Sequence, residues 1–258
     1  MSGNKNVVLV MGKPNTGKTA SLRNLPQESM VYLNTDQKDL PFADRFMGSM
    51  EVANPLSVIQ DEDGNGGYIG QIESEPSCTG AVLDTLTFLM SEYRDQYVTA
   101  PGVKDTRAAW GSYGSFYREL IRRIKAGTKS YAIFAHEQLI LNEQTGRYET
   151  SVPVQGAVGK VGVEADFTTI LAAKQIQIKE LESEGIENDL LTITDRERKT
   201  GLKYVFQTYT TAGSLGEKMR SAMDLWSEEE LYIDNDLNLV FERLNSYYGR
   251  SPALKGAA

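Results

Sequence analysis

Cysteine and long apolar runs are scarce in this chain, and each scarcity excludes a class of protein. The single cysteine, Cys78, rules out an internal disulfide and fits a reducing compartment. No stretch approaches the roughly 20 apolar residues of a membrane span. The first apolar run is too short for a signal peptide. We therefore expect a cytoplasmic protein without membrane contact.

Positive charge is also in deficit, with 27 Lys and Arg against 35 Asp and Glu and a net charge of −8. This balance argues against a generally basic surface that coats nucleic acid. A local basic groove remains open, because residues 180–197 and 228–236 hold much of the acid while 94–125 and 198–203 are comparatively basic. A length of 258 residues with 40% hydrophobic content suits one large α/β domain, or a core with a small appendage.

The most informative motif lies at residues 12–19, which read GKPNTGKT and complete the phosphate-loop pattern G-x-x-x-x-G-K-[ST]. An apolar strand is predicted before it at 6–11, and a helix after it from 19 to 23 that stops by Pro26. A chance match would lack this strand–loop–helix context. Backbone N–H groups of such a loop surround phosphates, Lys18 reaches the β- and γ-phosphates, and Thr19 holds Mg²⁺. Asn15 follows Pro14 and tolerates a left-handed turn.

These considerations predict a set of residues that contact ATP. The expected nucleotide contacts are Gly12, Lys13, Pro14, Asn15, Thr16, Gly17, Lys18, Thr19 and Ala20.

Short apolar strands alternate with helices along the rest of the chain, which predicts a mostly parallel sheet with helices on both faces. The expected strands are 6–11, 29–34, 81–84, 130–135, 168–173 and 204–208. The expected helices are 113–126, 215–226 with Ser214 as cap, and 237–248 with Asp236 as cap and Gly249 as stop. Residues 60–80, 97–112 and 142–163 are expected to be loops, and 251–258 a frayed tail.

Three carboxylates and one histidine follow these strands, where ligands gather in parallel sheets. Asp84 ends the run at 81–84 as a Walker B carboxylate does, and we expect it to bind Mg²⁺ with Thr19; the alternative is a turn Asp. Asp36 is a candidate base that orients water, or else a turn residue. His136 and Glu137 follow the fourth strand as a candidate γ-phosphate sensor, although a lone histidine is more often structural.

Together these stations resemble the RecA-like P-loop ATPases, in particular the small phage proteins of single-strand annealing and recombination. The resemblance spans about residues 5–225 and implies a RecA-like core at 1–225 with a C-terminal helical extension and tail at 226–258. It also implies the cytoplasm of a bacterial host. In that family the base at the Asp36 station is Glu and the sensor is an Asn-Gln pair. A glutamate such as Glu137 close to the γ-phosphate would repel it and slow hydrolysis.

The family resemblance gives the two longer loops a role as single-stranded DNA contacts. The loop 97–112 supplies Lys104, Arg107 and Trp110, and the loop 140–163 supplies Arg147 and Lys160, beside Tyr113 and Tyr148. The alternative is that both are plain solvated loops. The cations of residues 118–125 are interpreted as a solvated helix face.

Related proteins also assemble head to tail, as a filament or ring, with a cation supplied in trans to the nucleotide. Lys218 and Arg220 are the candidates, although surface cations on helices are common. A single-strand-binding protein is a further possible partner.

The sequence thus predicts a Mg²⁺-dependent ATPase that binds single-stranded DNA and promotes annealing or recombination. Two alternatives stay open at this point. One is a small-molecule P-loop kinase, for which an arginine-rich lid is not identifiable. The other is a nucleotide-dependent assembly module that barely hydrolyses.

Overall fold

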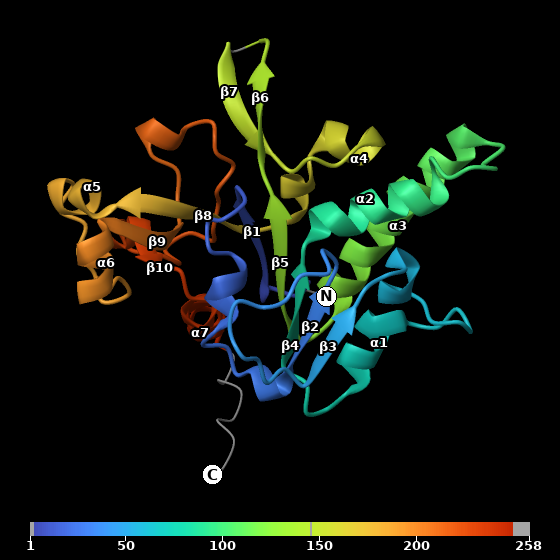
Figure 1. Cartoon of the computed structure of the whole chain (residues 1–258), viewed down its shortest axis with the longest axis horizontal. Helices are drawn as coiled ribbons and strands as arrows, with labels where there is room; N and C mark the ends of the chain where they lie inside the picture. Colours follow the sequence, from blue (N-terminus) through green and yellow to red (C-terminus); the bar gives the residue numbers. More distant parts are fainter. Residues whose placement is uncertain (1–2, 145, 250–258) are drawn as a thin grey trace.

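The computed structural model describes residues 3–144 and 146–249, which form an α/β fold around an eight-stranded mixed sheet (Figure 1). The strand order is β10-β9-β8-β1-β5-β4-β2-β3. Neighbours from β3 to β8 pair in parallel, whereas β9 and β10 join antiparallel. The sheet strands are β1 (Val7–Gly12), β2 (Met30–Asn34), β3 (Gly48–Glu51), β4 (Gly80–Asp84), β5 (Ser130–His136), β8 (Thr169–Gln177), β9 (Leu202–Gln207) and β10 (Tyr232–Asp234).

Helices flank this sheet, and a separate hairpin projects from it. The hairpin is β6 (Gln138–Asn142) and β7 (Arg147–Ser151). The α-helices are α1 (Gly67–Ser74), α2 (Leu86–Tyr97), α3 (Thr106–Ala126), α4 (Gly156–Val161), α5 (Ile178–Ser183), α6 (Asp195–Thr200) and α7 (Leu237–Tyr247). Short 3₁₀ turns are η1 (Thr19–Leu22), η2 (Gln27–Ser29), η3 (Pro55–Val58), η4 (Val163–Asp166), η5 (Ala212–Ser214) and η6 (Glu228–Leu231).

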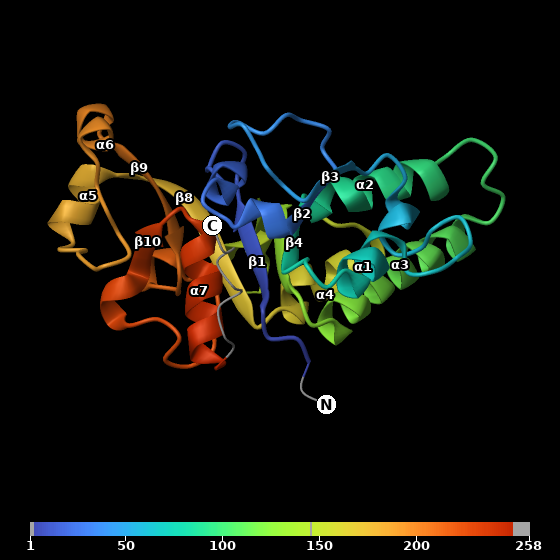
Figure 2. The same cartoon turned by 90° about the horizontal axis from the view of Figure 1, so that it is seen from below.

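Apolar side chains on both faces of the strands explain why helices cover both sides. In β1, Val7, Leu9 and Met11 join the core under α1, α2 and α3, while Val8 and Val10 join the core under α7. Every residue of β1, β2 and β4 is buried, as expected of parallel strands that are covered twice. Seen from below, α5–α7 gather at the β10 end of the sheet and α1–α3 at the other (Figure 2). All six predicted strands and the helices on both faces are confirmed.

The three segments predicted as loops hold more regular structure than expected. Helix α1 lies within 60–80, and β7 and α4 lie within 142–163. Helix α3 begins at Thr106 rather than 113, because the Asp105 carboxylate accepts a hydrogen bond from the Ala108 N–H at 2.9 Å and caps it. Trp110-Gly111 therefore lies inside a helix, and the prediction of a loop there is wrong.

The predicted helix at 215–226 is also wrong. The turn η5 ends at Ser214, and residues 215–226 form turns and irregular structure, with the Arg220 backbone paired to Ile170 of β8. The carbonyl of Gly216 accepts a hydrogen bond from the Thr150 N–H at 2.8 Å, so this segment supports β7 through its backbone. A side chain on Gly216 would collide with the Tyr148 backbone. Tertiary backbone pairing here overrides local helix propensity.

The phosphate-loop helix is shorter than predicted, since η1 ends at Leu22 as a 3₁₀ turn. The C-terminal helix, in contrast, is confirmed. The Asp236 carboxylate accepts from the Asn238 N–H at 2.9 Å, and Gly249 follows with a φ of 68°.

Residues 226–249, expected as an extension, contribute β10 to the sheet and α7 to the core. The predicted tail lies outside the described residues. No helix in the described ranges is long and apolar enough to cross a membrane.

Candidate nucleotide-binding site

The phosphate loop between β1 and η1 adopts the backbone that the motif requires. Asn15 and Gly17 have φ values of 64° and 85°, so the left-handed conformation predicted for Asn15 is present. The Thr16 hydroxyl donates to the Lys13 carbonyl at 2.8 Å and closes the loop. A Cβ on Gly12 would lie 2.6 Å from the Thr16 hydroxyl oxygen and 2.7 Å from the Ala173 carbonyl, so only glycine fits where the loop leaves β1.

Lys18 is buried and its ammonium is held by the loop itself. Its Nζ donates to the carbonyls of Gly12 at 2.7 Å and Lys13 at 2.9 Å. Burial lowers the pKa of Lys18 to about 8, although the nearby carboxylates of Asp84, Glu137 and Asp36 act in the opposite direction. An anion that approached the loop would find a preplaced, poorly solvated cation. This is the chemistry of a phosphate site.

Thr19 and Asp84 meet as predicted for a metal site. The Thr19 hydroxyl donates to Asp84 Oδ2 at 2.7 Å, and the buried Tyr32 hydroxyl donates to the same oxygen at 3.2 Å. Burial raises the pKa of Asp84 to about 6; the Thr19 hydroxyl lowers it and the Asp36 charge raises it. A buried carboxylate beside a hydroxyl suits Mg²⁺, which takes one or two protein oxygens and completes its shell with phosphates and water. Within residues 3–144 and 146–249, no group of three or more His, Cys, Asp or Glu could hold a metal.

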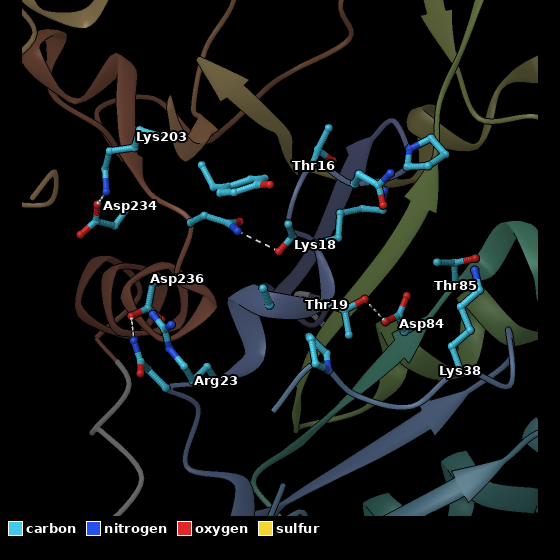
Figure 3. A pocket seen from close by; sticks show the side chains of 18 of the residues that line it. Thr16, Lys18, Thr19, Arg23, Lys38, Asp84, Thr85, Lys203, Asp234 and Asp236 are labelled. Carbon is cyan, nitrogen blue, oxygen red and sulfur yellow. Dashed lines mark hydrogen bonds and ion pairs between the residues drawn. The ribbon is translucent and has the colours of Figure 1, made fainter. Parts of the chain in front are cut away.

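A pocket of about 800 Å³ opens over the loop (Figure 3). Residues 14–20 line it together with Asp36, Asp84 and His136, so most of the predicted stations share one cavity. Asp36 follows β2, and its carboxylate lies 3.3 Å from the exposed Lys38 ammonium. The Thr35 hydroxyl donates to the Thr85 carbonyl at 2.7 Å and ties the ends of β2 and β4 together. The carboxyl ends of three neighbouring strands thus present Asp36, Asp84 and His136 to the same space.

The two sensor candidates, His136 and Glu137, line different cavities. His136 lines the pocket, and its ring packs edge-on against Phe88 at 5.4 Å between centroids. Burial lowers the pKa of His136, and the Lys18 and Lys38 charges lower it further, which favours neutral imidazole. Glu137 instead faces a separate cavity of about 10 Å³ with Glu217 and Lys218. Burial raises the pKa of Glu137, and the Glu217 charge adds to this.

The predicted DNA-binding residues all lie outside the pocket. Lys104 lies in the α2–α3 connection, Arg107 on α3, Arg147 on β7 and Lys160 on α4, and all four are exposed. Trp110 is half-buried, with its ring edge-on to Tyr113 at 5.3 Å between centroids. The same ring lies 3.1 Å from where a Cβ on Gly156 would be. Its visible role is to hold α4 against α3.

The two candidates for a cation in trans also lie away from the pocket. The Lys218 ammonium is 4.0 Å from the buried Glu164 carboxylate. Arg220 is exposed and lines a second pocket of about 550 Å³ with Lys5 and Lys125, near the start of β1. Neither side chain lines the nucleotide pocket of its own chain.

Sequence reasoning missed the wall of the pocket that comes from β9 and β10. Tyr204 and Asn235 line it, and Asn235 Nδ2 donates to the Gly17 carbonyl at 2.8 Å. Lys38 and Thr85 also line the pocket. Lys38 and Thr85 lie within two residues of predicted stations and were within reach of the motif argument. Tyr204 and Asn235 carry no motif and lie near Gly17 only because of the sheet order.

Comparison with protein-family models and with curated proteins finds no match for this chain. The chemistry of the site is therefore argued from its own residues.

Proposed function

We propose that this protein is a Mg²⁺-dependent ATPase with a RecA-like core that binds single-stranded DNA and promotes annealing or recombination. The observation that carries the nucleotide part is the convergence of Lys18, the Thr19–Asp84 pair and Asp36 in one pocket. Three strand ends supply these groups in the arrangement expected of phosphoryl transfer. The family assignment and the DNA part rest on the motif resemblance and on the exposed cations beyond the pocket.

In the proposed reaction, water attacks the γ-phosphate and releases ADP, inorganic phosphate and a proton. Asp36 accepts a hydrogen bond from the attacking water and orients it. Lys18 leaves the carbonyls of Gly12 and Lys13 to neutralise charge on the phosphate oxygens. Thr19 and Asp84 would hold Mg²⁺, which neutralises further phosphate charge when bound.

The position of Glu137 supports turnover over a module that barely hydrolyses. Repulsion between this carboxylate and the γ-phosphate was the reason to expect slow hydrolysis. Glu137 does not line the nucleotide pocket, so in this proposal it makes no direct contact with the γ-phosphate, although its charge still acts on Lys18. Neutral His136 is left as the group that contacts the γ-phosphate, and its strand continues directly into the β6–β7 hairpin.

The DNA part of the proposal places the strand along the hairpin, α4 and the α2–α3 connection. These segments project on one side of the sheet in Figure 1. Their exposed cations offer phosphate contacts, and Tyr148 offers a ring, whereas Trp110 is occupied by packing. In the same proposal, chains assemble head to tail, and Lys218 or Arg220 of one chain completes the site of its neighbour.

The test is ATP turnover by the full chain, with and without single-stranded DNA. We expect Mg²⁺-dependent turnover that DNA stimulates, and loss of at least about 100-fold in Lys18→Ala because transition-state charge is left unpaired. Lys179→Ala, on α5 away from the pocket, is the matched control and should keep full activity. A wild-type chain that binds no ATP in equilibrium titration would remove the proposal.

A further inference from the structure

We infer that Tyr204 is the surface on which the nucleobase of the bound nucleotide stacks, an inference that rests on the proposed nucleotide-binding function. The pocket extends well beyond the groups that a triphosphate needs. Its far wall comes from β9, β10 and the segment before α6, and includes Lys203, Tyr204 and Asn235.

The two ends of the pocket differ in chemistry, and this difference orients the ligand. Thr19 and Asp84 mark the end for the terminal phosphates, on the β4 side of β1. The wall from β9 and β10 lies on the opposite side of β1 in the sheet order. Figure 3 shows Lys203, Asp234 and Asp236 across the phosphate loop from Asp84. With its phosphates toward Asp84, a nucleotide extends its nucleoside toward β9 and β10.

Tyr204 presents an open apolar face at this wall. Side chains alternate along β9, so Leu202 and Tyr204 share the exposed face, at 39% and 42% exposure, while Lys203 and Val205 are buried. The Cδ1 atom of Tyr204 lies 3.0 Å from where a Cβ on Gly17 would be, so its ring abuts the phosphate loop. A half-exposed ring directly beside a phosphate site is placed to stack on a base.

The polar groups around Tyr204 are already engaged by protein partners. The Lys203 ammonium lies 2.7 Å from the Asp234 carboxylate and 3.0 Å from that of Glu197. Asp236 accepts from the Asn24 side chain at 2.5 Å and from the Asn238 N–H. These ion pairs and hydrogen bonds hold the wall together, and we infer that the groups in them do not hydrogen-bond the edge of a base.

Asn235 donates from its amide nitrogen to the Gly17 carbonyl, whereas its side-chain oxygen has no hydrogen-bond partner among the described residues but is buried away from the surface that a base would contact. Stacking alone serves every base, because each base has a π-face. The subsite therefore accepts adenine and guanine with similar affinity.

The experiment compares ATP, GTP and inorganic tripolyphosphate, each with Mg²⁺, by calorimetric titration of the full chain. In Tyr204→Ala, we expect affinity for ATP and GTP to fall about tenfold, with tripolyphosphate binding unchanged. Tyr204→Phe keeps the ring and should stay within about twofold of wild type. Tyr247→Ala, which removes an equally exposed ring on α7 outside the pocket lining, is the control and should not alter ATP binding.

Each of four results would contradict one of these proposals. Unchanged ATP affinity in Tyr204→Ala, or equal losses for ATP and tripolyphosphate, would overturn the stacking role while leaving the nucleotide function standing. A wild-type preference for ATP over GTP well beyond about tenfold would overturn the base tolerance. A wild-type chain that binds neither ATP nor tripolyphosphate would instead remove the proposed function itself.

Discussion

Lys18 in the phosphate loop and Asp84 at the end of β4 are both buried, and burial lowers the pKa of Lys18 and raises that of Asp84, so that both shifts favour the neutral form. Burial of a charged group costs solvation free energy, and only a well-placed partner of opposite charge offsets that cost. In the proposed complex, phosphate oxygens supply that partner for Lys18 and a metal ion supplies it for Asp84. The same burial that is unfavourable for an isolated charge strengthens its interactions with a bound nucleotide.

Glu73 is a carboxylate with a structural role. It accepts hydrogen bonds from the Thr128 N–H at 2.8 Å and the Tyr131 hydroxyl at 2.7 Å, and so anchors α1 to the turn before β5. Burial raises the pKa of Glu73, but the hydrogen bonds from Thr128 and Tyr131 outweigh this effect and bring the pKa below its ordinary value of 4.5. The ionised form therefore stabilises the folded state.

We predict that Glu73→Gln lowers the free energy of unfolding by about 1–2 kcal/mol at pH 7, because charge-assisted hydrogen bonds are lost. Since the folded-state pKa lies below the unfolded one, this contribution is complete above pH 4.5 and disappears as pH falls through the folded-state value. Urea titrations from pH 7 to pH 3 measure the effect. Glu62→Gln, at an exposed carboxylate, is the control, and equal pH dependence in both variants would contradict the prediction.

The β6–β7 hairpin is unusual in leaving apolar side chains open on both of its faces. Leu139, Ile140 and Leu141 are consecutive in β6, so they alternate between faces, and all three are exposed. Tyr148 on β7 is 64% exposed. Exposed apolar side chains that cluster in this way are typical of surfaces that contact a partner. The hairpin begins two residues after His136, so a partner bound to the hairpin would be connected to the pocket through a short stretch of backbone.

We predict that Tyr148→Ala weakens binding of oligo-dT about tenfold, because one stacking contact is lost. Arg147→Ala should also weaken DNA binding, to a similar extent for different DNA sequences. It should reduce the slope of log affinity against log salt concentration by about one. Fluorescence anisotropy at several salt concentrations measures both. Arg196→Ala, at an exposed arginine on α6, should leave affinity and slope unchanged. If Tyr148→Ala and Arg147→Ala also match wild type, the hairpin is not the DNA contact.

Residues 226–249 form part of the sheet and of the hydrophobic core rather than a peripheral extension. Strand β10 extends the sheet beyond β9, and α7 covers the face opposite α1–α3. Asn235, between these two segments, donates to the Gly17 carbonyl, so the end of the chain also holds the phosphate loop. Folding of the core and shaping of the site therefore depend on residues more than 200 positions apart.

We predict that a chain ending at residue 225 does not fold. It would lose six buried side chains from one core: Trp226, Ile233, Leu237, Val240, Phe241 and Leu244. At about 1.5–3 kcal/mol each, their burial is comparable to the whole stability of a domain, about 5–15 kcal/mol. Circular dichroism and thermal melting of the shortened and full chains measure the loss. A cooperative melt in the shortened chain would show instead that 226–249 is a separable extension.

Helix boundaries and the C-terminal part of the fold were predicted least well. The segment 215–226 has apolar residues at helical spacing, yet backbone bonds to Thr150 of β7 and Ile170 of β8 hold it in irregular structure. The start of α3 was missed because Gly111 resembled a breaker, whereas the Asp105 cap and tertiary packing decide the boundary. In the first case, contacts distant in sequence outweighed a local preference of a few tenths of a kcal/mol, about the spread of helix propensities, whereas the Asp105 cap is itself a local signal.

The amino-acid sequence by itself determined the phosphate loop, the buried strands and the carboxylates at their ends, because each depends on residues close together in the chain. Only the tertiary structure decided which strands are neighbours. That order places Tyr204 and Asn235 beside Gly17, and it leaves His136 but not Glu137 in the lining of the pocket. The physical reason is that strand pairing is set by burial summed over the whole sheet, and no short segment carries that information.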